Sequence, residues 1–238
     1  MMTPIRPRPD DADALLELAQ WLREDEAFWS PWRTLMALLY AAWALTLLAL
    51  LLFPSLAQAQ PQPPAAARWR LELTRAAHSQ WGLDAPVPAL AAQVHQESGW
   101  NPLAVSAVGA RGMAQFMPQT ARWWCALNGL GAADCQPHNP TWALRALVGY
   151  DKWLFERAPL HYTVRDRLWV ALRAYNGGLG HWQAEALATG LARPTRAQVD
   201  AACGRARRAA LHCVENLAYP RRILDVLQPR YAAWGAVL

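Results

Sequence analysis

The stretch from Val87 to Ala121 constrains the fold most, because it begins as a helix with an acid on its buried side. Leu90, Val94 and Glu97 are spaced i, i+4 and i+7, so their side chains share one helical face. Prolines at the start of this segment favour a helix beginning, and Gly99 favours an end just after the acid. The pattern therefore predicts a helix that ends with a carboxyl group facing the core.

A carboxyl group in that position has an unusual acidity. Burial removes water from the ionised form of Glu97 and raises its pKa. A carboxylic acid that is still protonated near neutral pH is suited to general acid catalysis. From spacing alone, two other interpretations stay open: a buried Glu paired with an Arg, and a helix-end Glu that turns to solvent.

Charge is distributed unevenly along the 238 residues. Residues 1–34 contain seven acidic residues and four Arg, whereas residues 60–238 contain eleven acidic residues and 19 Lys and Arg. A basic main part fits an anionic partner such as a cell-wall polymer or a membrane surface, but it also fits a simple bias toward Arg, since Lys152 is the only Lys. No long basic block interleaved with aromatic residues is present, so we expect no nucleic-acid partner.

The N-terminal third divides into three segments. Residues 1–34 form an acidic tail, residues 35–53 are 19 residues without a charge, and residues 54–67 are a linker rich in Pro, Ala and Gln. The uncharged run is long enough to span a bilayer, and Arg33 before it favours a cytoplasmic N-terminus. Everything downstream, residues 68–238, is then expected to be a periplasmic domain.

The uncharged run has three interpretations. It is an uncleaved inner-membrane anchor; or it is a signal peptide, since Ala57-Gln58-Ala59 has the small-residue cleavage pattern and a start near Met36 would give an ordinary leader; or it is a buried core helix. The absence of an amphipathic face argues against the third. The first two agree on export and differ only in whether the domain stays tethered.

The exported part has helical patterns and no strand pattern of any length. The expected fold class is therefore mainly α with little or no sheet, preceded by a single N-terminal transmembrane or signal helix. Besides the helix that contains Glu97, apolar periodicity predicts helices over residues 68–80, 113–127, 141–157 and 163–176, and weaker ones over 182–189 and 195–208. The segment over 215–231 is broken by Pro220 and Pro229.

The four cysteines all follow the uncharged run and fall into two pairs with the same ten-residue offset. In an oxidising periplasm the simplest connectivity is Cys125–Cys135 and Cys203–Cys213. Other pairings and four buried thiols are the alternatives. The spacing does not match zinc ligands and no His-Glu-x-x-His occurs, so we expect no metal site.

The residues after Glu97 carry a resemblance. Residues 97–121, from Glu-Ser-Gly-Trp-Asn-Pro to Met-Pro-Gln-Thr-Ala, resemble the core signature of the lytic transglycosylase SLT family of the lysozyme-like superfamily. Ala174-Tyr175-Asn176-Gly177-Gly178 resembles the family's Ala-Tyr-Asn element, which continues with Ala or Gly and then Gly. Glu215 and Tyr219 resemble its late Glu-x-x-x-Tyr. The resemblance covers roughly residues 69–230.

Two positions depart from the family pattern. The Thr-Arg that usually follows the late Glu is Asn216-Leu217 here. The family's Tyr-Leu pair corresponds to Tyr150-Asp151, so the match is loose at that point.

The resemblance implies a reaction with a single catalytic acid and no cofactor. In the family, one Glu protonates the MurNAc–GlcNAc β-1,4 oxygen and then, as a carboxylate, takes the proton of the C6 hydroxyl, which closes on C1 as 1,6-anhydroMurNAc. Glu97 would have this role. Ser106 and Gln115 would hydrogen-bond the sugar or Glu97, Tyr175 would position Glu97, and the groove would be shaped by Met117, Asn176, Glu215 and Tyr219.

Two other functions are compatible with the same sequence pattern. A lysozyme-type muramidase of the same fold would admit water, and a non-catalytic wall-binding protein would keep the groove without the chemistry. The short domain without a wall-binding repeat favours a partner in a trans-envelope secretion or conjugation machine, with peptidoglycan strands as the substrate and the inner membrane as the anchor.

Overall fold

The structure is a computed structural model, and it describes residues 13, 16, 17, 20, 35, 36, 38–45 and 62–237. The chain forms two compact units, Met1–Gln58 and Ala59–Leu238. No helix within the described ranges is both long and apolar enough to cross a membrane. Most of the acidic tail, much of the predicted span over 35–53, the Ala57–Ala59 cleavage pattern and most of the linker lie outside the described residues.

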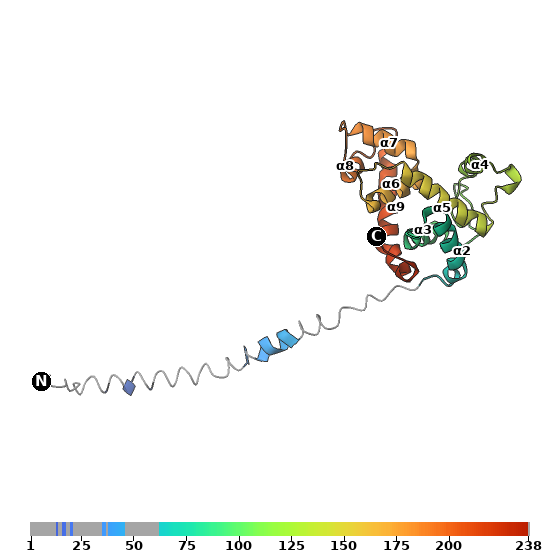
Figure 1. Cartoon of the computed structure of the whole chain (residues 1–238). Coiled ribbons are helices and arrows are strands. Elements are labelled where there is room, and N and C mark those ends of the chain that lie inside the picture. The colour runs from blue at the N-terminus through green and yellow to red at the C-terminus, as the bar shows by residue number, and fades with distance from the viewer. Residues whose placement is uncertain are drawn as a thin grey trace. The chain divides into compact units, whose positions relative to one another are not determined.

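The second unit is built from helices and short helical turns (Figure 1). Their order is α2 (Pro64–Trp81), α3 (Val87–Ser98), α4 (Pro118–Leu127), η1 (Ala132–Asp134), α5 (Pro140–Glu156), α6 (Val164–Gly177), α7 (Leu179–Ala188), α8 (Arg196–Ala201), η2 (Ala210–His212), α9 (Cys213–Arg221), η3 (Arg222–Leu227) and η4 (Gln228–Trp234). In the part of the chain that the structure describes, extended pairing is limited to isolated bridges around Arg111. The mainly helical prediction is confirmed.

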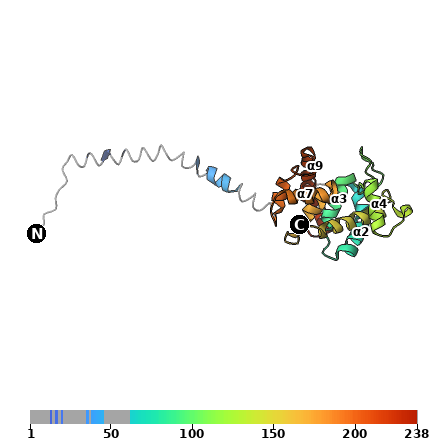
Figure 2. The same cartoon turned by 90° about the horizontal axis from the view of Figure 1, so that it is seen from above.

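Helix α3 lies at the centre of this unit and packs against α2, η3 and η4 (Figures 1 and 2). Its first eight residues are all buried, which explains the apolar sequence of the segment. The helix ends where Gly99 adopts a left-handed conformation with φ of 60°, and its N–H donates to the carbonyl oxygen of His95. Glu97 therefore sits in the last turn of a helix that the core holds on most sides.

The segment before α4 differs from the prediction. A helix over 113–127 was expected, but α4 begins only at Pro118. Residues Arg111 and Phe116 pair through both backbone hydrogen bonds, and Gln115 has φ of 47°, which a right-handed helix does not allow. Pro118 then occupies the first turn, where its missing N–H costs nothing. The first five predicted helical residues instead form a tight loop.

Other helix limits also differ from the prediction. Helix α2 begins at Pro64, within the predicted linker and four residues before residue 68. Helix α7 begins at Leu179 rather than residue 182. Helix α8 ends at Ala201, so the helix expected over 195–208 is wrong in its second half. Gly204, with φ of 79°, turns the chain there into a loop.

Both predicted disulfides are present. Cys125–Cys135 joins the end of α4 to the segment after η1, and Cys203–Cys213 closes the loop between α8 and α9, each with 5.9 Å between Cα atoms. By the chain-entropy argument each crosslink stabilises the fold by on the order of 2–3 kcal/mol. The second one makes residues 203–213 a covalently closed loop.

Candidate active site

Glu97 is held between α3 and α9. The hydroxyl of Tyr219, on α9, donates a hydrogen bond to Oε1 of Glu97. Burial raises the pKa of Glu97 to about 7; the Tyr219 hydrogen bond opposes this shift, and the charge of Glu215 adds to it. Near neutral pH the carboxyl group is therefore present in both its protonated and its ionised form.

Three tyrosines surround this acid. Burial raises the pKa of Tyr150 to about 12 and the pKa values of Tyr175 and Tyr219 well above their usual range. All three therefore remain neutral hydroxyl donors at physiological pH. Tyr175 donates to the carbonyl oxygen of Ala114 at 2.7 Å. In the structure, Tyr219 is thus the tyrosine that hydrogen-bonds Glu97, whereas the sequence predicted that Tyr175 positions this acid.

A cavity of about 360 Å³ opens directly on Glu97. Six of the seven predicted substrate-binding residues line it, together with five others: Ser106, Gln115, Met117, Tyr175, Asn176 and Glu215, with Val108, Ala110, Phe116, Thr120 and Tyr150. The seventh, Tyr219, contacts Glu97 but does not form part of the wall. The fold therefore brings residues from four separate segments of the chain around one carboxyl group.

Ser106 and Gln115 hold the loop that forms one side of this cavity. The Ser106 hydroxyl accepts from the Ala110 N–H at 3.0 Å. Nε2 of Gln115 donates to the carbonyl oxygens of Gly112 at 2.8 Å and Ala104 at 3.3 Å. None of these three hydrogen bonds goes to Glu97, so the predicted contact of these residues with a sugar remains a prediction.

Residues on the opposite side of the cavity are hydrogen-bonded to a buried polar cluster. Nδ2 of Asn176 lies 3.4 Å from Oε1 of Glu215, and its Oδ1 accepts from Nδ2 of Asn216 at 2.9 Å. Asn216 in turn accepts from Nε of Arg173 at 3.0 Å and is buried. The position of Asn176 in the wall is therefore set by groups deep in the domain.

Sequence reasoning missed a second buried acid near Glu97. Asp151 on α5 is 2% exposed, its Oδ1 accepts from Nε2 of Gln93 at 3.3 Å, and among the described residues its Oδ2 has no partner. Burial, and secondarily the charge of Glu97, raises the pKa of Asp151 well above its usual range. The available signal was the departure from the Tyr-Leu pair, which places an acid on a helix predicted to be largely buried.

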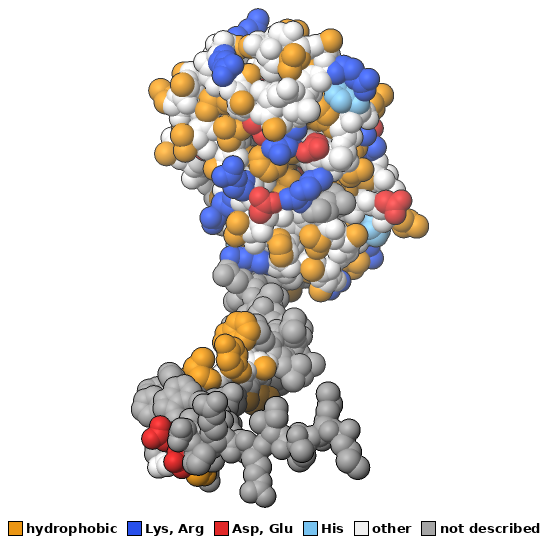
Figure 3. All heavy atoms as spheres, turned by 90° about the vertical axis from the view of Figure 1, so that its left-hand side faces the viewer, with side chains coloured by type: hydrophobic (Ala, Val, Ile, Leu, Met, Phe, Trp, Pro, Cys, Tyr) orange, Lys and Arg blue, Asp and Glu red, His pale blue; other side chains and the backbone are white. Residues whose placement is uncertain are grey.

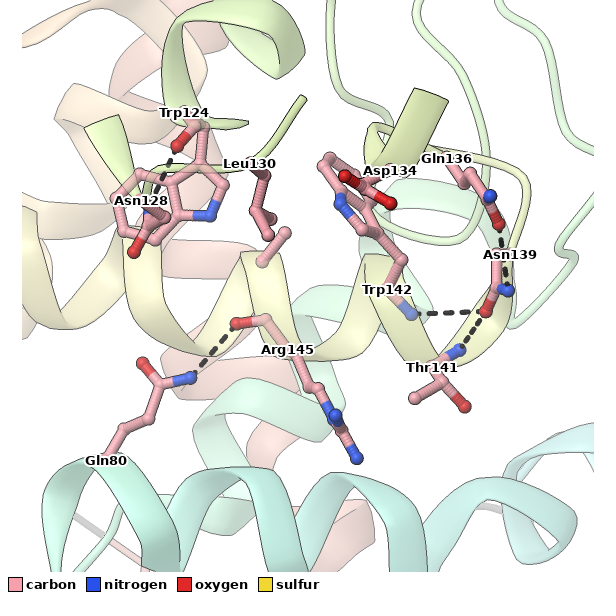
Figure 4. Close-up of a pocket in the computed structure, with 11 residues that line it drawn as sticks. Gln80, Trp124, Asn128, Leu130, Asp134, Gln136, Asn139, Thr141, Trp142 and Arg145 are labelled. Carbon is pink, nitrogen blue, oxygen red and sulfur yellow. Dashed lines mark hydrogen bonds between the residues drawn. The ribbon is translucent and has the colours of Figure 1, made fainter. Parts of the chain in front are cut away.

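A larger cavity, of about 700 Å³, lies elsewhere, between α2, α5 and the segment that follows α4 (Figure 4). It is lined mainly by amide and aromatic side chains, among them Gln80, Asn128, Gln136 and Trp142, and by none of the predicted site residues. Trp142, in its wall, packs edge-to-face on Phe116, which lines the Glu97 cavity, with ring centroids 5.5 Å apart. The candidate chemistry is therefore confined to the smaller cavity.

One cluster within the described ranges has metal-ligating atoms close together: Glu185, Cys203 and Cys213. Both cysteines are in a disulfide, and Glu185 is paired with Arg173 and Arg208. This cluster therefore has no thiolate for a metal ion.

Comparison with known proteins adds to this geometry. Residues 72–193 match the family model described as the transglycosylase SLT domain. The chain is 42% identical over 105 residues to membrane-bound lytic murein transglycosylase F of Maricaulis maris, covering 44% of this chain and 21% of that protein. It is 38% identical over 92 residues to the protein of the same name from Aliivibrio fischeri, covering 39% and 17%. The chain thus spans about a fifth of the length of these relatives.

The 70 kDa soluble lytic transglycosylase SLT70 of Escherichia coli is a structural neighbour. It superposes with a TM-score of 0.50 at 20% identity, covering 71% of this chain and 25% of that one. At this identity the likeness concerns the fold alone.

Proposed function

Since this chain belongs to the family of transglycosylase SLT domains, we propose that it is a peptidoglycan lytic transglycosylase that cleaves the MurNAc–GlcNAc β-1,4 bond. The observation that carries the proposal is the carboxyl group of Glu97, with a pKa raised to about 7, in the wall of a cavity lined by the family's signature residues. Relatives named lytic murein transglycosylase support the same substrate.

In the first step, protonated Glu97 is the general acid. The Tyr219 hydroxyl donates a hydrogen bond to Oε1 of Glu97. Oε2 is therefore the oxygen that gives its proton to the glycosidic oxygen. The C1–O bond of MurNAc breaks, the GlcNAc portion leaves as an alcohol, and positive charge develops at C1. A pKa near the working pH makes this proton transfer efficient.

In the second step, the same group is the base. The Glu97 carboxylate, stabilised by the Tyr219 hydroxyl, takes the proton of the C6 hydroxyl of the same MurNAc. O6 then bonds to C1, which closes the 1,6-anhydro ring and returns Glu97 to its protonated form. No water is consumed and no cofactor takes part.

Hydrolysis is the second candidate. Glu215 lines the same cavity, and a second carboxylate facing the sugar is what a muramidase uses to activate water. The lytic reaction is the better proposal because the relatives are named for it and Glu97 alone supplies both proton transfers.

Mass analysis of the products tests both candidates. Purified full-length protein is incubated with sacculi, and the released muropeptides are weighed, with the Glu97→Gln variant as the matched control. Anhydro products, lighter than reducing ends by one water, are expected from the wild type alone. Reducing ends would identify a muramidase, and binding to sacculi without any release would identify a wall-binding protein.

We also propose that the enzyme works in the periplasm, attached to the inner membrane by residues 35–53, and that it opens the wall for a secretion or conjugation machine. The uncharged run and relatives named membrane-bound support attachment. Cell fractionation that recovers the full-length protein from the soluble cytoplasm would overturn the location. A pull-down without any envelope-machine component would overturn the partner.

A further inference from the structure

The Glu97 cavity continues into a second one with a different character. This neighbouring space, of about 450 Å³, shares Asn176 and Glu215 with the Glu97 cavity. We call it the basic cavity and define it by its lining residues: Asn176, Gly177, His181, Arg207, Arg208, Ala209, His212 and Glu215. A ligand that occupies it therefore lies next to the group bound at Glu97.

Two buried nitrogen atoms, one of them a guanidinium donor, belong to residues that line the basic cavity. Among the described residues, Nη2 of Arg208 and Nδ1 of His181 are buried without a hydrogen-bond partner. Arg208 is 6% exposed, so the unpaired guanidinium nitrogen is not simply a solvated surface group. Buried polar atoms are nearly always paired, and such an exception calls for an explanation.

The charge of Arg208 is only partly balanced inside the protein. Its Nε donates to Oε1 of Glu185 at 2.7 Å, but the other oxygen of Glu185 accepts from Arg173 at 2.5 Å. One carboxylate is thus shared between two buried guanidinium groups. An anion in the basic cavity would supply Arg208 with the second partner that the fold does not provide.

The backbone next to Arg208 leaves space for its guanidinium group. A Cβ atom on Gly177 would overlap Nη1 of Arg208 and Nδ2 of Asn216. The SLT element accepts Ala or Gly at this position, and here only Gly leaves room for the guanidinium.

The loop that provides most of the basic side chains is also fixed in place. Arg207, Arg208 and His212 all lie within the loop that the Cys203–Cys213 disulfide closes. A pre-ordered loop loses less entropy on binding. This loop lies outside residues 72–193, so it belongs to this chain beyond the family match. Figure 3, which faces the side of the domain with α7 and α8, shows Lys and Arg side chains in several separate groups across this face.

Resting on the proposed function, we infer that the basic cavity binds a carboxylate of the peptide that MurNAc carries on its lactyl group. Guanidinium groups match the planar geometry of a carboxylate, and this anion is the one that the substrate itself brings beside the cleaved bond. Glu215, on the shared wall, repels an anion and directs it toward Arg207 and Arg208. The enzyme thereby distinguishes peptide-bearing strands from stripped ones.

Substrate preference is the first test. Full-length wild type is expected to have a higher kcat/KM on soluble glycan strands that keep their peptides than on strands stripped by an amidase. Arg207→Gln should reduce this preference about tenfold, the effect of one charge-assisted contact. Arg205→Gln is the matched control, because Arg205 is an exposed Arg of the same loop that does not line the cavity. Equal preference in wild type and Arg207→Gln would overturn the inference.

Direct binding is the second test, and it does not depend on cleavage. Isothermal titration with the free stem tetrapeptide should show binding to wild type and Arg205→Gln, and about tenfold weaker binding to Arg207→Gln and Gly177→Ala. If strands are not cleaved but the peptide binds in this pattern, the proposed function fails and the carboxylate site stands. If inorganic phosphate binds as well as the peptide, or if no variant weakens peptide binding, the site does not recognise the stem.

Discussion

Two buried polar clusters lie on either side of Asn176, and both contain carboxyl groups removed from water. In the arginine cluster, Arg173 is fully buried and donates to Glu185 at 2.5 Å and to Asp200 at 2.9 Å. Glu185, also fully buried, accepts from Arg208 as well. Each acid there has a cation within hydrogen-bond distance.

The acids of the other cluster, Glu97 and Asp151, have no such partner. None of the ion pairs formed by the described residues includes either one. Their hydrogen bonds come from neutral groups, the Tyr219 hydroxyl and the Gln93 amide. Burial raises the pKa of each.

Pairing with a cation distinguishes a structural acid from a reactive one in this domain. A cation stabilises the ionised form and offsets part of the desolvation penalty, so the acid serves to hold the fold, although burial still raises the pKa of Asp200. Neutral donors leave much of that penalty in place, so the proton is retained to higher pH and is available for transfer. The same substitution, Glu to Gln, should therefore have opposite consequences in the two clusters.

Glu97→Gln should have the largest effect on catalysis. The amide keeps the shape but neither gives nor takes a proton, and each general acid–base step contributes about 10²–10⁴-fold. Because both steps use Glu97, we expect muropeptide release to fall by at least the upper part of that range. Thermal unfolding at pH 8 should show equal or slightly higher stability, since a costly buried carboxylate is removed. Release near the wild-type rate would remove Glu97 from the mechanism.

Glu185→Gln should instead damage the fold. It leaves Arg173 and Arg208 without their shared carboxylate, and breaking a buried ion pair costs about 3–5 kcal/mol. Urea unfolding should therefore shift to much lower denaturant concentration. The control is Glu156→Gln, which removes an exposed i,i+4 pair with Lys152 and should cost less than about 1 kcal/mol. Equal effects of the two variants would contradict the comparison.

The helix that carries Glu97 and the two disulfides could be predicted from sequence because their signals are local. Proline and glycine mark the ends of α3, apolar spacing places Glu97 on the buried face, and a ten-residue offset pairs the cysteines. These features depend on residues close together in the chain. The start of α4 was predicted wrongly because the Gln115 side chain holds a turn by donating hydrogen bonds to two loop carbonyl oxygens. Apolar periodicity in the sequence does not indicate such contacts.

What the sequence could not provide is long-range pairing. Tyr219 bonds Glu97 across 122 residues, whereas Tyr175, whose motif resembles the family's more closely, bonds a loop carbonyl. Asp151 was expected on a buried helix, but its partner Gln93 belongs to another helix. Such contacts depend on how helices pack, which residue spacing does not determine.

The dependence of stability on pH offers a finer comparison of the two clusters. The folded-state pKa values of Glu97 and Asp151 lie above their unfolded values, so the folded protein binds more protons over the interval between them. Their favourable contribution is complete below the unfolded values and is lost as pH rises, through about 7 for Glu97. Asp151→Asn should therefore flatten the fall in the free energy of unfolding between pH 5 and pH 8. A wild-type slope kept in this variant would exclude Asp151 as its source.

The smallest effect, and the most informative about Glu97, is expected from Tyr219→Phe. The Tyr219 hydrogen bond lowers the pKa of Glu97 and so partly opposes the effect of burial. Removing the hydroxyl should raise that pKa, move the pH optimum of cleavage upward and reduce the rate by at least about tenfold, since a hydrogen bond to a charged group contributes about 1.5 kcal/mol or more. Tyr175→Phe is the matched control, because its hydroxyl donates to Ala114 rather than to the acid. It should lower the rate without moving the optimum. A pH profile that shifts in Tyr175→Phe and not in Tyr219→Phe would return the positioning role to Tyr175, as the sequence alone suggested.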